Sequence, residues 1–224
     1  GFKPPHAGHY NMAKWLAKNT DAEQIVVKIG SGVRDGISRE MSLQLWTLYI
    51  QSDKDSSSGK ISARASQSPS PVRDVYDFIE AEAPEGSKVY LGLGEKDTEN
   101  NSPVKDVYDF IENPLGDIKK IYLGLGSKDI KDGRYSAVNK YAKKGVDVKI
   151  TEVPPQSGGI SGEVMRGFIK DGDKVSFYNN LPNHLSNEQK AQAWDIVFSA
   201  TKEIKFAKDV RAMSKQLEED LYNP

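Results

Sequence analysis

Short apolar segments of the chain alternate between strand-like and helix-like spacing. The run Ile25–Ile29 is rich in β-branched residues and ends at a glycine, which is typical of a buried strand followed by its exit loop. Apolar residues then recur at helical spacing from Ser38 to Tyr49, with Ser38 as a suitable N-cap. Lys60–Ala65 predicts a further strand. This alternation favours an α/β fold.

The pattern continues into the second half of the chain. It predicts a helix over Tyr135–Lys144, a strand over Val146–Val153 and a loop over Pro154–Gly159. A short helix over Ser161–Gly172 and a helical tail from Ser186 follow. Ser186 with Gln189 forms a capping box for the tail. Strands that alternate with helices predict a Rossmann-like parallel sheet flanked by helices, with right-handed crossovers.

An internal repeat interrupts this alternation. The stretch Ser70–Glu80 returns as Ser102–Glu112, and Val89–Gly94 returns as Ile121–Gly126, with a constant offset of 32 residues. Each copy combines a helix that starts at proline with a strand, so each predicts one α/β unit. Two copies are too few for a solenoid, so we interpret the repeat (70–97 and 102–129) as a local duplication or a joining of two related sequences.

Length and composition limit the number of domains, the kinds of partner and the kinds of site that this chain can have. The 224 residues predict one domain over 1–182 with a helical C-terminal tail over 183–224. The net charge of −1 gives no indication of nucleic acid or an anionic membrane as partner. Without cysteine, disulfides and thiolate sites are excluded. No apolar run is long enough to span a bilayer and no signal peptide is visible, so we expect a cytoplasmic protein.

The first nine residues carry the most specific chemistry. His6 and His9 flank Gly8 directly before a helical pattern, after a rigid Pro-Pro. The N-terminus of a helix binds anions through free backbone N–H groups, and two imidazoles there can donate to phosphate oxygens. Gly8 lets a nucleotide approach the backbone. The alternatives are a surface loop or a metal site, but no third ligand lies nearby because His184 is in the tail. We therefore predict no metal ligands.

This string resembles the G-x-F-x-P-x-H-x-G-H signature of the nucleotidylyltransferase superfamily. Ile160–Arg166 resembles the second motif of that superfamily, I-S-[SG]-T-x-x-R, and follows the last predicted strand as it should. Glu163 replaces the usual threonine. A carboxylate there would repel a triphosphate, although an acidic residue in the first turn of a helix is also favourable by itself.

The resemblance implies nucleotidyl transfer from ATP or CTP to a small phosphate-bearing acceptor, with release of pyrophosphate. The sequence is similar to phage and bacterial nicotinamide-mononucleotide adenylyltransferase-like proteins. The second motif resembles that of the adenylyltransferases more than that of the cytidylyltransferases, so it favours adenylyl transfer. His9 would stabilise the transition state, His6 and Lys3 would hold phosphates, and Mg²⁺ would bridge the phosphates. The implied nucleotide-binding residues are Phe2, Gly8, Ser161, Gly162 and Arg166. A homo-oligomer is compatible with this assignment.

The acceptor side is expected at the carboxyl ends of other strands. The strand ends Gly92–Asp97 and Gly124–Asp129 resemble the substrate-side loop of the superfamily. We favour the second copy, with Gly124, Gly126 and Asp129, because it leads directly into the last helix–strand unit. Arg34 and Arg39 follow the strand Ile25–Ile29 at the same predicted edge and could hold a phosphate of the acceptor or of the triphosphate. The alternatives are ordinary turns and solvated arginines.

One expectation concerns a strand that the superfamily places before the histidine loop. The sequence starts at Gly1 without it, so we expect the first strand to be missing and the duplicated strand either to fill the gap beside Ile25–Ile29 or to add at an edge. The alternative function is a catalytically impaired nucleotide-binding or interaction module. Ala212–Gln216 resembles the K-M-S-K-S loop of class I aminoacyl-tRNA synthetases, but the chain is too short for one.

Overall fold

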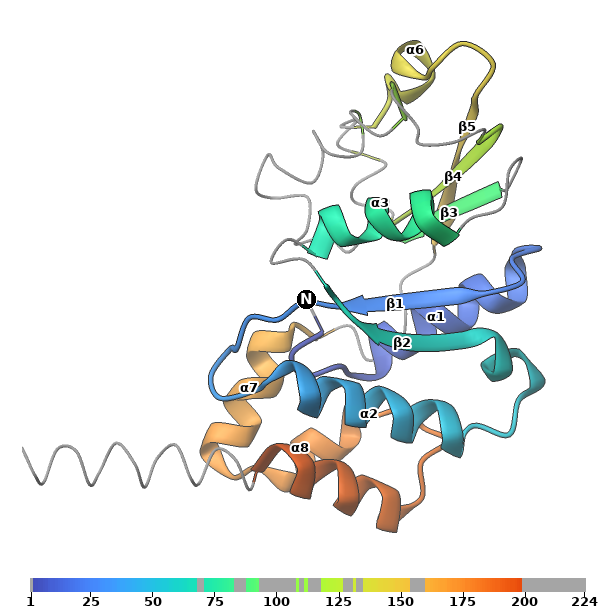
Figure 1. Ribbon diagram of the computed structural model, residues 1–224. Coiled ribbons are helices and arrows are strands. Elements are labelled where there is room, and N and C mark those ends of the chain that lie inside the picture. Colours follow the sequence, from blue (N-terminus) through green and yellow to red (C-terminus); the bar gives the residue numbers. More distant parts are fainter. Residues whose placement is uncertain are drawn as a thin grey trace, which may run out of the picture.

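The computed structural model describes residues 2–67, 71–82, 88–92, 108, 111–112, 118–126, 131, 135–153 and 160–198. Within these residues the chain is a mixed α/β protein with parallel strands, compatible with a Rossmann-like fold (Figure 1). Most of the second repeat helix, the loop at 154–159 and Ala212–Gln216 lie outside them. No helix in the described part is long and apolar enough to cross a bilayer.

The first sheet is formed by two parallel strands. The helix α1 (Ala7–Asn19) leads into β1 (Ile25–Ile29), and α2 (Arg39–Ser52) with the short 3-10 helix η1 (Ser56–Lys60) leads into β2 (Ile61–Ala65). Ile25 pairs with Ile61 and Ile29 with Ala65. Both strands are confirmed where the sequence predicted them. The predicted cap of α2 is also confirmed, because the Ser38 hydroxyl accepts from the Met41 N–H at 3.2 Å.

The second sheet contains both strands of the repeat. It is parallel, in the order β3 (Lys88–Gly92), β4 (Lys120–Gly126) and β5 (Asp147–Val153). Lys88 pairs with Lys120 and Gly92 with Gly124, so the register of the pair equals the 32-residue offset of the repeat. The rings of Tyr90 and Tyr122 stack at 4.5 Å. Each residue of β3 therefore lies beside its own copy.

The duplicated strand does not fill a gap beside β1. In the described residues β1 is hydrogen-bonded to β2 alone, and β3 to β4 alone. The expectation of gap filling is therefore wrong for these strands. The physical reason is that the two copies carry the same or closely similar side chains at the same positions, so β3 pairs with β4 in register. Among the described residues, Asp21, before β1, links the two sheets by accepting hydrogen bonds from the Lys88 and Tyr90 side chains of β3.

The described apolar side chains form two clusters. The first contains residues of α1, β1, α2, α7 and the C-terminal helix at 187–198, and the second contains residues of α3, β3, β4 and β5. Trp194 and Val197 pack in the same cluster as Tyr10 and Trp46. The C-terminal helix up to residue 198 is thus part of the core around α1.

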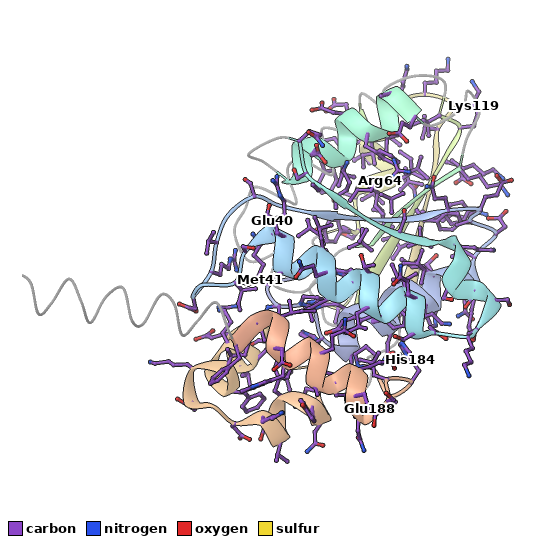
Figure 2. All side chains as sticks on the ribbon, turned by 60° about the horizontal axis from the view of Figure 1, so that its bottom comes forward. Glu40, Met41, Arg64, Lys119, His184 and Glu188 are labelled. Carbon is purple, nitrogen blue, oxygen red and sulfur yellow. The ribbon has the colours of Figure 1, made fainter. Side chains whose placement is uncertain are left out.

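The first repeat helix, α3 (Pro71–Glu82), covers the face of β1 and β2 opposite α2 (Figure 1). Lys28 on β1 forms a buried ion pair with Asp74 on α3 at 2.8 Å. The Phe78 ring lies 5.0 Å from the Lys28 ammonium and 5.2 Å from the Arg64 guanidinium. Figure 2 labels Arg64 between β2 and this helix. Polar groups therefore attach the repeat to the first sheet.

The remaining helices differ from the prediction in length and number. The helix α6 (Val138–Tyr141) is shorter than the expected Tyr135–Lys144 because turns flank it. The helix α7 (Gly162–Asp171) ends as expected at Gly172, whose φ of 73° is left-handed. The sequence did not indicate α8 (Lys174–Asn179), which Asp173 caps. The capping box is confirmed, with the Ser186 N–H donating to Gln189 at 2.9 Å.

Candidate functional site

The predicted phosphate loop lies beside the carboxyl end of β1 (Figure 1). Phe2 packs edge-on against Trp46 of α2, with ring centroids 5.8 Å apart. The Lys3 side chain is buried, and its ammonium is within electrostatic range of Arg34, Arg39 and Glu40. Burial is the main cause that lowers the pKa of Lys3; the two arginines also lower it, whereas Glu40 opposes them. Glu40 lies at the start of α2, and His184 lies near the other end of this helix, beside the Tyr49 carbonyl (Figure 2).

The two histidines cap α1 reciprocally. His6 is the N-cap, and its Nδ1 accepts from the Gly8 N–H at 3.2 Å. His9, at the third helical position, accepts from the His6 N–H through its own Nδ1 at 3.3 Å. This is the geometry of a capping box, with imidazole nitrogens in the place of the usual oxygens. The two rings lie 3.7 Å apart.

The caps determine which tautomer each histidine adopts. A nitrogen that accepts a hydrogen bond carries no proton, so both rings hold their proton on Nε2. Burial lowers the pKa of His6 to about 4. Burial also places the pKa of His9 well below its usual value, and the neighbouring His6 lowers it further. Both imidazoles are therefore neutral at pH 7 and keep an Nε2–H donor.

The backbone donors expected to bind an anion at α1 are already used. The Ala7 N–H donates to the Asn180 carbonyl at 2.9 Å, and the Gly8 N–H donates to His6. The expectation of free N–H groups at this helix start is therefore wrong for both. The physical reason is that the same histidines that make the motif also satisfy the helix terminus. The groups that can donate hydrogen bonds to a ligand at this helix start are therefore the imidazole Nε2–H groups.

Arg166 connects the second predicted motif to the first. Its Nη1 donates to the Lys3 carbonyl at 2.9 Å, and its Nε pairs with the Asp35 carboxylate at 2.6 Å. Ser161 caps α7 by accepting from the Val164 N–H at 3.3 Å. A Cβ on Gly162 would lie 3.3 Å from the Arg166 Nη1 and 3.4 Å from the Lys3 carbonyl oxygen, so a larger residue there would crowd the Arg166 donor. The structure thus brings Lys3, Gly162 and Arg166 together.

Asp35 is the site residue that sequence reasoning missed. It lies in a two-residue turn, Asp35-Gly36, whose φ values of 47° and 83° are both positive. Arg34 and Ile37 exchange both backbone hydrogen bonds around it. Asp-Gly is a preferred sequence for a hairpin turn with two positive φ angles. This dipeptide, in the loop that follows the strand Ile25–Ile29, was the available signal for the turn, although not for the contact with Arg166.

The two predicted arginines have different surroundings. Arg34 is exposed at the base of the turn. Arg39 is half-buried; its Nε donates to Glu40 at 3.0 Å and its Nη1 to the Ser66 carbonyl at 3.3 Å. Arg39 therefore joins the start of α2 to the end of β2, and Arg34 is the more accessible of the two.

The glycine candidates on β4 lie apart from this cluster. A Cβ on Gly124 would be 3.2 Å from Val153 and 3.7 Å from Leu16. Leu16 lies two turns along α1 from His9, which is about 10 Å. Gly124 is therefore a packing position between β4, β5 and α1. Gly126 ends β4, and Asp129 lies outside the described residues.

The described side chains do not assemble a carboxylate site for Mg²⁺. No group of three or more His, Cys, Asp or Glu residues is placed to hold a metal within the part of the chain that the structure describes. The clustered donors are nitrogen groups, which suit phosphate oxygens and not Mg²⁺.

Comparison with known proteins returned no match to a family model, a curated protein or a solved structure.

Proposed function

We propose that this chain binds a nucleoside triphosphate at Lys3, His6, His9 and Arg166 and transfers its nucleotidyl group to a phosphate-bearing acceptor. The observation that carries the proposal is the hydrogen bond between Arg166 and the Lys3 carbonyl. It joins the two motifs that resemble those of the nucleotidylyltransferase superfamily, although they are far apart in the sequence. We infer membership of that superfamily from these residues alone.

The neutral histidines support binding of a polyphosphate. Each keeps an Nε2–H donor at pH 7, because its Nδ1 accepts from the backbone. Such fixed donors stabilise charge that develops on phosphate oxygens without having to reorganise. Lys3 and Arg166 add positive charge beside them. The set is therefore suited to a group with several negative charges.

The proposed reaction is a single in-line displacement. An oxygen of the acceptor phosphate attacks the α-phosphorus, the bond from that phosphorus to the bridging oxygen breaks, and pyrophosphate leaves with the electron pair. His9 would donate to the α-phosphate, whereas Lys3, His6 and Arg166 would hold the β- and γ-phosphates. Mg²⁺ would arrive bound to the triphosphate, as part of the substrate. Adenylyl transfer is our first choice and cytidylyl transfer the second.

Binding without turnover is the second candidate function. It is favoured by two contacts: the α1 backbone donors are occupied by His6 and Asn180, and the Arg166 Nε is paired with Asp35. A nucleotide-binding or interaction module needs affinity only. An enzyme also needs donors directed at the transition state.

Pyrophosphate release separates the two functions. The chain would be incubated with MgATP, MgCTP, MgGTP or MgUTP and a panel of phosphomonoesters that includes nicotinamide mononucleotide. Acceptor-dependent release with ATP supports adenylyl transfer, and release with CTP alone would move the assignment to cytidylyl transfer. Triphosphate binding without release from any pair supports the binding module. Absence of both binding and release would overturn both functions.

A further inference from the structure

The turn that carries Asp35 is a tight and well-defined element. The Arg34 N–H donates to the Ile37 carbonyl at 3.1 Å, and the Ile37 N–H donates back at 2.9 Å. Between them, Asp35 and Gly36 both have positive φ. Asparagine and aspartate tolerate this conformation better than other residues with a side chain. The turn therefore presents a carboxylate at its tip in a defined position.

That carboxylate occupies one side of Arg166. Its Oδ2 lies 2.6 Å from Nε, and the Asp35 side chain is 74% exposed whereas Arg166 is only 14% exposed. An ion pair with one partner in solvent contributes little stability, because water and salt compete for it. A phosphate oxygen can make the same contact with more charge than a carboxylate. Asp35 is therefore replaceable at Arg166.

The other side of Arg166 is fixed independently. Its Nη1 donates to the backbone carbonyl of Lys3 at 2.9 Å, and this contact does not involve the turn. The guanidinium can therefore keep its position when the partner of Nε changes. Replacement of Asp35 by a phosphate would be an exchange of one anion for another at a fixed cation.

We propose that Asp35 is an internal competitor for the phosphate that binds Arg166, and that polyphosphate binding releases the 34–37 turn. The inference rests on the proposed function. The same turn carries Arg34, whose charge acts on the Lys3 ammonium. Release of the turn would therefore couple binding at Arg166 to the position of a second cation of the site.

The test measures binding of inorganic tripolyphosphate by titration calorimetry. Asp35→Asn removes the charge and keeps a side chain that tolerates positive φ. We expect it to bind tripolyphosphate about twofold to fivefold more tightly than the wild type, the range that an exposed ion pair supports. Asp171→Asn is the matched control, since it makes the same charge change at the other end of α7. The gain should disappear in the Asp35→Asn/Arg166→Ala double variant.

The three variants separate competition by Asp35 from a general effect of charge. A gain in Asp35→Asn that is absent from Asp171→Asn and lost without Arg166 supports competition. An equal gain in both single variants would show a general charge effect and overturn it. Unchanged or weaker binding in Asp35→Asn would also overturn competition by Asp35. In that case, pyrophosphate release by the wild type would still support nucleotidyl transfer. Absence of tripolyphosphate binding in every variant would overturn the competitor and the polyphosphate site together.

Discussion

Arg166 donates a hydrogen bond from Nη1 to the carbonyl oxygen of Lys3, across 163 positions of sequence, at 2.9 Å. The donor is in the first turns of α7, and the acceptor belongs to the loop before α1. Gly162 lies against both atoms, because a Cβ there would be 3.3 Å from Arg166 Nη1 and 3.4 Å from the Lys3 oxygen. This contact decides whether the two predicted motifs act as one site.

Substitution of Gly162 tests the contact. Gly162→Ala should lower kcat/KM for nucleotidyl transfer by up to about 10-fold, because the added methyl group would lie 3.3 Å from Arg166 Nη1 and would shift this donor within its charge-assisted hydrogen bond. Steady-state pyrophosphate release measures this. Gly167→Ala in the same helix is the control, since its Cβ would meet nothing within 4 Å. It should keep full activity and raise stability by about 0.5–1 kcal/mol. Equal activity in both variants would contradict the role of the contact.

His9 has a structural and a proposed catalytic role that one substitution can separate. Glutamine is a common residue at the third position of a capping box, so His9→Gln should keep the bond from the His6 N–H and unfold close to the wild type. His9→Ala should lose about 1 kcal/mol. Both variants should lose about 10²-fold to 10³-fold in kcat, because neither supplies the Nε2–H donor. Thermal unfolding and pyrophosphate release measure the two roles. Wild-type turnover by His9→Gln would remove His9 from the proposed mechanism.

The capping histidines predict a loss of stability in acid. Burial holds the pKa of His6 at about 4, below the 6.5 of a free imidazole. Between these values the unfolded chain binds a proton that the folded chain does not. The free energy of unfolding should therefore fall as the pH falls from about 6.5 to about 4, by about 1.4 kcal/mol per pH unit for this histidine.

Urea unfolding at several pH values measures this dependence. His6→Asn is the informative variant, because asparagine is a good N-cap and does not titrate. It should fold at pH 7 and show a shallower dependence than the wild type below pH 6.5. The dependence that remains should include His9, whose pKa burial also lowers. An unchanged slope in His6→Asn would show that His6 does not titrate in this way.

The buried ion pair between Lys28 and Asp74 predicts that single and double variants differ markedly in the free energy of unfolding. The two side chains are 9% and 5% exposed. Lys28→Met should destabilise the protein by about 3–5 kcal/mol, because it removes the Lys28 ammonium from beside a buried carboxylate. Lys28→Met/Asp74→Asn should recover most of this, since asparagine can still accept from the Gln67 N–H. Urea unfolding measures both.

An exposed ion pair on the same helix is the control for that prediction. Arg64 pairs with Glu82 at 2.8 Å, and both side chains are more than a third exposed. Glu82→Gln should change stability by less than about 1 kcal/mol. A similar effect of Lys28→Met would show that α3 does not depend on the buried pair for its attachment to β1.

Local patterns predicted the elements well where the determining groups are close in sequence. The strand Ile25–Ile29, the cap at Ser38, the stop at Gly172 and the box of Ser186 and Gln189 each depend on a few neighbouring residues. The helix at Lys174–Asn179 was missed because its six residues are too few to show a helical period. The pairing of β3 with its own copy was also missed, because both copies carry the same pattern and the pattern does not specify a partner.

The sequence by itself determined the alternation of strands and helices, the repeat and its offset, and the two motifs that suggest phosphate chemistry. Only the tertiary structure decided that the histidines use their Nδ1 atoms to cap α1, that Asn180 takes a backbone donor from the same helix, and that Asp35 pairs with Arg166. The physical reason is that periodicity and capping are local properties of the backbone. The partner of a donor or a charge depends on which distant segments packing brings together.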